Sequence, residues 1–97
     1  MHARVSTYRF EANRADDVVT AFETAAGAVE EMEGQRGVYL LLDRENGKAI
    51  TITLWESADA LAATAAAADE VRSDATSSYG GSIESVESYE VALHEIP

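Results

Sequence analysis

Two apolar segments joined by an Asn-Gly dipeptide narrow the choice of fold more than any other part of this sequence. The first, residues 38–43, is a continuous apolar run that ends in Asp43. The second alternates aliphatic residues with threonine and tryptophan over residues 49–55: Ile50, Ile52 and Leu54 against Thr51, Thr53 and Trp55. Between them, Asn46-Gly47 accepts the positive φ angles of a tight hairpin turn. We therefore predict two antiparallel neighbouring strands.

The remaining chain is predicted to supply two helices and two further strands. Residues 3–10 alternate and carry the β-branched and aromatic residues of a strand. A first helix follows the acidic pair Asp16-Asp17 and ends at Gly34, because its apolar residues repeat at spacings of four and three: Val18, Phe22, Ala25, Val29 and Met32. Ser57 is a predicted N-cap for an alanine-rich helix over residues 58–75, a loop over 77–82 follows, and residues 83–93 form the last strand.

This order, βαββαβ, predicts an α+β fold of the ferredoxin-like type, with an antiparallel sheet and one domain over residues 1–97. A chain of this length buries only about 60–65% of its unfolded surface. Strand residues 38–42 are apolar on both faces, whereas the helices of such a fold cover one face only. A second copy of the chain is the expected cover, so we predict a homodimer.

Charge and composition exclude several classes of partner. Eighteen acidic residues against seven basic ones give a net charge of -11, which repels nucleic acid and anionic lipid surfaces. The chain has no cysteine, no apolar run long enough to cross a membrane and no signal-peptide core at its start. We therefore expect a cytoplasmic protein without a nucleic-acid or membrane partner.

Two stretches carry a family resemblance: residues 37–43, Gly-Val-Tyr-Leu-Leu-Leu-Asp, and residues 51–57, Thr-Ile-Thr-Leu-Trp-Glu-Ser, a strand that runs straight into a helix. They resemble the antibiotic biosynthesis monooxygenase family of dimeric α+β barrels. The resemblance implies that two sheets form a shared barrel and that each subunit keeps a ligand cavity between its sheet and its helices. It also implies oxygenation of a small hydrophobic or aromatic molecule without metal or flavin, the enolate of the substrate reducing oxygen.

Haem degradation, found in related proteins, is disfavoured by the residues themselves. Those proteins carry an asparagine on the first strand and, in the second helix, a tryptophan and a haem-ligating histidine. The matching places here fall near Ser6, Thr64 and Asp74, none of which can do the same chemistry. We therefore predict no bound cofactor.

The candidate pocket residues are those that the barrel model places near the cavity: Ser6, Tyr8, Phe22, Tyr39 and Leu61. Either tyrosine is able to hold a substrate oxygen or donate a proton, although tyrosine is also an ordinary strand residue. The candidate dimer-interface residues are Arg9, Thr53 and Trp55. Arg9 is expected near Glu87, in an interface ion pair or at the substrate. His2 and His94 alone make a weak metal site, and we predict no metal.

Two functions remain open. The first is a cofactor-independent monooxygenase, which the resemblance favours. The second is a non-catalytic dimeric ligand-binding or stress-response accessory protein, which the lack of an identifiable acid/base pair favours. The alanine-rich helix bears on both, because it either packs close to the sheet or leaves a cavity beneath it.

Overall fold

A computed structural model describes all residues, 1–97. Its elements occur in the predicted order, βαββαβ, with a short 3₁₀ helix before the first α-helix and a second helical region in two parts. They are β1 (His2–Arg9), η1 (Ala12–Arg14), α1 (Ala15–Glu30), β2 (Gln35–Asp43), β3 (Lys48–Trp55), α2 (Ala58–Ala63), α3 (Ala65–Tyr79) and β4 (Ser82–Glu90).

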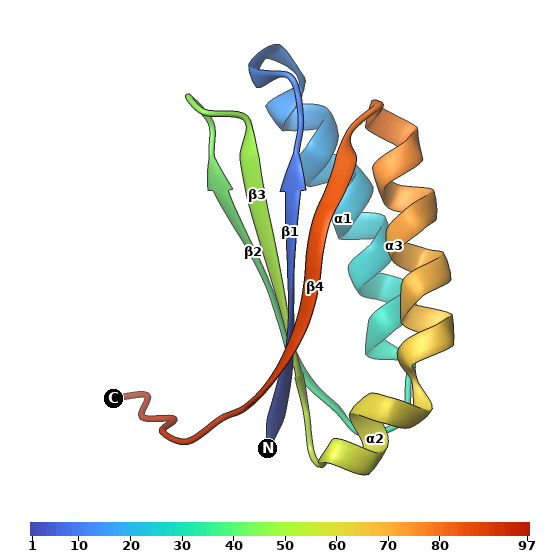
Figure 1. Ribbon diagram of the computed structural model, residues 1–97, viewed down its shortest axis with the longest axis vertical. Coiled ribbons are helices and arrows are strands. Elements are labelled where there is room, and N and C mark those ends of the chain that lie inside the picture. Colours follow the sequence, from blue (N-terminus) through green and yellow to red (C-terminus); the bar gives the residue numbers. More distant parts are fainter.

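The four strands form one antiparallel sheet in the order β2-β3-β1-β4. Figure 1 shows α1 and α3 side by side on one face of this sheet, whereas the opposite face carries no helix. The predicted ferredoxin-like α+β class is therefore confirmed. None of the helices is both long and apolar enough to cross a membrane.

The β2–β3 hairpin forms at the predicted place, but residues 44–47 separate its last pair, Asp43 and Lys48, and of the Asn-Gly pair only Gly47 has a positive φ. Gly47 has φ +62°, and its carbonyl accepts a hydrogen bond of 2.9 Å from the Phe10 amide. Asn46 donates to the Asp43 carboxylate from its side chain and its backbone, and these bonds lower the pKa of Asp43. The turn thus ties the hairpin to the end of β1.

The second helical region differs from its prediction in two respects. A break at Thr64 divides it, and the Thr64 hydroxyl donates back to the carbonyls of Ala60 and Leu61. The helix also continues through Ser77 and Ser78 to Tyr79 before Gly80, at φ +71°, ends it. The predicted loop over residues 77–82 was wrong there, because the side chain of Tyr79 is anchored in the core. Ser57 is the N-cap as predicted, accepting from the Ala60 amide at 3.0 Å.

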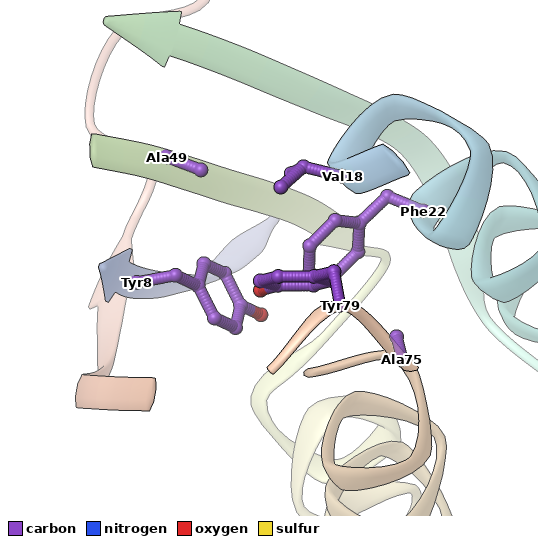
Figure 2. Packing of buried hydrophobic residues seen from close by; sticks show 6 residues of the cluster. All are labelled: Tyr8, Val18, Phe22, Ala49, Ala75 and Tyr79. Atoms are coloured by element: carbon purple, nitrogen blue, oxygen red, sulfur yellow. The ribbon is translucent and has the colours of Figure 1, made fainter. Parts of the chain in front are cut away.

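Aromatic rings form the centre of the small hydrophobic core. Figure 2 shows Tyr8 from β1, Phe22 from α1 and Tyr79 from the end of α3, with Val18, Ala49 and Ala75 around them. The ring centroids of Tyr8 and Phe22 lie 4.9 Å apart, and those of Phe22 and Tyr79 lie 6.0 Å apart. Large rings compensate for the small alanine side chains that α3 brings to the core.

The helix-free face of the sheet carries exposed apolar side chains. Tyr39, Leu41 and Tyr89 each keep about half of their surface exposed, at 48%, 48% and 49%. Arg9 also lies on this side, but it pairs with Glu84 at 2.8 Å and not with Glu87 as predicted. The register of β1 with β4 places Glu87 opposite Val5, whereas Arg9 lies opposite Ser82.

Candidate functional site

A cavity of about 400 Å³ lies between the two long helices and the sheet. Eleven of its eighteen lining residues are hydrophobic, a composition suited to an apolar or aromatic ligand. Helix α3 contributes Ala68, Val71 and Arg72, and the small alanine explains why the helix leaves space above the sheet. Of the two arrangements considered for the alanine-rich helix, the structure thus has the one with a cavity.

A tyrosine and a threonine form a polar pair on the sheet side of this cavity. The hydroxyls of Tyr8 and Thr51 share a hydrogen bond of 2.9 Å, and the two residues are 1% and 9% exposed. Ser6, at 2%, is the neighbouring cavity residue on β1. These hydroxyls are able to orient a polar substituent of a bound ligand while Phe22 contacts its apolar part.

Two arginines line the same cavity. Arg4 on β1 is 5% exposed and Arg72 on α3 is 7% exposed. One nitrogen of Arg4, Nη2, donates to the Leu61 carbonyl at 2.6 Å, and its guanidinium lies 5.3 Å from the ring centroid of Trp55. Arg72 pairs with Asp69 at 3.0 Å, one turn earlier on the helix. Burial lowers the pKa of Arg4, and the charge of Arg72 lowers it further.

The other buried hydroxyl of the core belongs to Tyr79. Its oxygen forms no hydrogen bond of good geometry, and burial raises the pKa of this phenol although the nearby Thr76 side chain lowers it in part. Tyr79 packs behind Phe22 and is not among the residues that line the cavity. Its hydroxyl is therefore a feature of the core next to the candidate site.

The structure brings three of the five predicted pocket residues to the cavity: Ser6, Tyr8 and Phe22. Tyr39 is the main correction. Strand alternation points Val38, Leu40 and Leu42 toward the helices, so Tyr39 lies on the helix-free face. The Leu61 side chain does not line the cavity either, although its carbonyl holds Arg4.

The three predicted interface residues lie in three different places. Trp55 has no exposed surface within the chain, and its indole nitrogen donates to the Thr53 hydroxyl at 2.9 Å, so the contacts seen for its side chain lie within one subunit. Thr53 lines the cavity and Arg9 lies at the surface of the helix-free face. In the register of β1 with β4, His2 lies opposite Glu90, which comes four residues before His94.

The sequence-based prediction missed Arg4 and Arg72. Arg4 shares the alternation of Ser6 and Tyr8, which was the available signal on β1. On α3 the buried residues are Ala68, Arg72, Ala75, Thr76 and Tyr79, so Arg72 lies on the same helix face as the two buried alanines. An arginine inside a stripe of otherwise small and aromatic residues is the sign to look for.

Comparison with known proteins gives one family. The family model for antibiotic biosynthesis monooxygenase matches residues 1–73. Among curated relatives, an uncharacterised protein of Mycobacterium tuberculosis is 29% identical over 93 residues, which are 95% of this chain and 41% of that protein. A second one is 35% identical over 66 residues, covering 68% of this chain and 28% of its own length. The chain therefore spans less than half the length of these relatives.

Solved structures share the fold at low sequence identity. A candidate antibiotic biosynthesis monooxygenase from Deinococcus radiodurans superposes with a TM-score of 0.75 at 16% identity, covering 100% of this chain and 98% of its own. SnoaB, a cofactor-independent oxygenase from Streptomyces nogalater, gives a TM-score of 0.73 at 15% identity, with 99% and 96% covered. At these identities the likeness concerns the fold alone.

Proposed function

The chain belongs to the antibiotic biosynthesis monooxygenase family, and we propose that its helix–sheet cavity binds a small hydrophobic or aromatic molecule and supports its oxygenation without metal or flavin. The observation that supports this most is the cavity itself, with about 400 Å³ of space and a mainly hydrophobic lining. SnoaB, a protein of the same fold, is a cofactor-independent oxygenase.

The residues of the cavity fit the needs of such a reaction. An activated, acidic CH₂ group of the substrate would release a proton to solvent as the substrate enters the cavity, and the enolate that remains reduces oxygen. One oxygen atom then becomes a carbonyl at that carbon and the other leaves as water. The protein's part is to exclude bulk water and to hold the enolate oxygen by a hydrogen bond, and the Tyr8 hydroxyl is positioned for that bond beside Thr51.

Oxygen uptake with a panel of anthrones, quinols and acyl phenols, each with and without a carboxyl group, tests this proposal. We expect at least one compound to be turned over, and we expect Tyr8→Phe to lower the rate about tenfold or more through loss of one positioning hydrogen bond. Tyr39→Phe is the matched control, because it removes the same hydroxyl from the opposite face of the sheet. Equal rates for wild type and Tyr8→Phe would contradict the role of Tyr8.

The alternative is a non-catalytic ligand-binding or stress-response accessory protein. It is supported by the surroundings of Tyr8, whose side-chain hydrogen-bond partner is Thr51. A threonine hydroxyl is neither a general acid nor a general base, so the Tyr8 hydroxyl has no acid or base beside it. Thermal stabilisation by members of the panel without oxygen uptake would favour this alternative. Neither stabilisation nor uptake would contradict both.

The proposed working unit is a homodimer of one-domain subunits. The exposed apolar side chains of the helix-free face support this, because a monomer would leave Tyr39, Leu41 and Tyr89 in water. A second sheet packed on this face would bury them, as in a sheet-on-sheet core. The cavity lies on the other side of the sheet and would stay within one subunit.

A further inference from the structure

The two cavity arginines stand apart from the other cations of the chain. The remaining four arginines, Arg9, Arg14, Arg36 and Arg44, form ion pairs at the surface, where 40–58% of each side chain is exposed. Arg4 and Arg72 are instead more than nine-tenths buried, and both line one largely hydrophobic cavity. Burying a charged guanidinium among apolar groups costs free energy, so each of these arginines needs compensating partners.

The chain supplies only part of that compensation. Arg4 forms no ion pair, and its Nη1 is buried without any hydrogen-bond partner, although Nη2 is held by the Leu61 carbonyl. Arg72 pairs with Asp69, whose side chain is 71% exposed and is therefore screened by water. The cavity thus holds two guanidinium groups with hydrogen-bond donors to spare and no buried anion between them.

We propose that the ligand of this cavity carries a carboxylate, which Arg4 and Arg72 bind, so that the substrate class is small aromatic or aliphatic acids. The proposal rests on the proposed use of the cavity and specifies what enters it. A guanidinium matches the planar geometry of a carboxylate and binds it more strongly than a neutral acceptor. The unpartnered Nη1 of Arg4 shows that the chain itself leaves a donor of this guanidinium unsatisfied.

The same arrangement predicts how the acid would lie. Arg4 is fixed on one side by the ring of Trp55 and on another by the Leu61 carbonyl, so its position is set before the ligand arrives. The apolar body of the ligand would then extend over Phe22, Val38 and Leu40, which line the same space. A chain with a net charge of -11 repels anions at long range, which makes these local cations the more necessary.

Two carboxylates of the chain are the competing partners. Glu23 and Glu30 on α1 also line the cavity, but both residues are exposed, and neither pairs with Arg4 or Arg72. Their solvated position at the mouth leaves the buried guanidinium groups free for a ligand. They also disfavour ligands with a second negative charge, so a monocarboxylate is the expected form.

Isothermal titration calorimetry with a matched pair of probes, 2-naphthoate and 2-naphthamide, measures the two dissociation constants and tests the proposal. The two molecules have nearly the same shape and differ in charge. We expect wild type to bind the acid about ten to a hundred times more tightly than the amide. In Arg4→Gln and in Arg72→Gln the preference should fall to about threefold or less. Arg36→Gln, which removes a surface arginine of the same charge, should keep the wild-type preference.

Each outcome of this titration either supports or overturns the carboxylate proposal. Equal binding of acid and amide by wild type would overturn the carboxylate proposal while leaving the cavity as a site for neutral ligands. Binding of neither probe would count against the proposed function itself, and the carboxylate proposal would fall with it. A preference lost equally in Arg36→Gln would assign it to general surface charge and overturn the proposal. If Arg4→Gln does not fold, the wild-type preference and Arg72→Gln still decide.

Discussion

At the scale of single residues, the Tyr79 hydroxyl is buried without a hydrogen bond of good geometry, and burial outweighs the opposing effect of Thr76 and raises the pKa of its phenol above the ordinary value of 10.0. In the unfolded chain this phenol ionises near pH 10, whereas in the folded chain it keeps its proton to higher pH. The folded state therefore loses stability as the pH rises above about 10. Below that pH the phenol is neutral in both states and this effect is absent.

Replacing Tyr79 by phenylalanine removes both the unpaired hydroxyl and its titration. We expect Tyr79→Phe to match or exceed the wild-type free energy of unfolding at pH 7, by up to about 1 kcal/mol, and to lose less stability between pH 9 and 11. Urea unfolding at a series of pH values measures this. A variant less stable than wild type at pH 7 would mean that the hydroxyl has a partner, such as a bound water, that stabilises it.

Single residues also show where sequence reasoning stops. Tyr8 and Ser6 were assigned to the cavity side correctly, because alternation along β1 fixes their shared face. Tyr39 was not, because its neighbours are apolar on both faces of the strand and no pattern tells the two sides apart. Arg4 was predictable from the same alternation as Tyr8, but a buried arginine contradicts the usual preference of charged residues for the surface.

At the scale of elements, two glycines offer a matched test of the local structure. Gly47 adopts φ +62° in the β2–β3 turn, and a Cβ there would collide with the carbonyl oxygen of Phe10. Gly27 lies inside α1, where a Cβ would meet nothing within 4 Å. The same substitution should therefore have opposite effects at the two positions.

We expect Gly47→Ala to lower the free energy of unfolding by about 2 kcal/mol or more, because strain at positive φ adds to the collision. Gly27→Ala should raise it by about 0.5–1 kcal/mol, since alanine favours the helix more than glycine does. Chemical denaturation of both variants measures the two changes. A tolerated Gly47→Ala would contradict the tight turn that ties the hairpin to β1.

The elements were largely predictable because most of them carry a period or a turn signal. The Asn-Gly turn and the strands beside it, the stripe of α1 and the Ser57 cap all led to observed structure. The alanine-rich helix was the exception. Its residues favour helix everywhere and therefore carry no mark of the break at Thr64, and the serines before Tyr79 imitate a loop.

At the scale of the whole molecule, the helix-free face of the sheet predicts association. We expect the wild-type chain to have twice its 10.4 kDa mass in solution, measured by light scattering after gel filtration. Leu41→Lys should return it to the monomer mass, because a charge would be buried in the proposed interface. Ala66→Lys, which adds the same charge to the exposed side of α3, is the control and should stay dimeric.

A monomeric wild type would contradict the dimer but not the cavity, which lies on the other side of the sheet. A dimer that survives Leu41→Lys would place the interface elsewhere on the surface. In both cases the proposed ligand chemistry is tested separately, by the oxygen-uptake and titration experiments.

We propose that this protein binds its ligand in the cavity between the helices and the sheet. Two-dimensional NMR of the ¹⁵N-labelled protein during titration with 2-naphthoate shows whether it does. We predict that the amide signals of cavity residues shift, in particular those of Ser6, Phe22, Thr51 and Arg72. Shifts confined to the helix-free face around Tyr39 and Leu41, or no shifts at all, would contradict the claim.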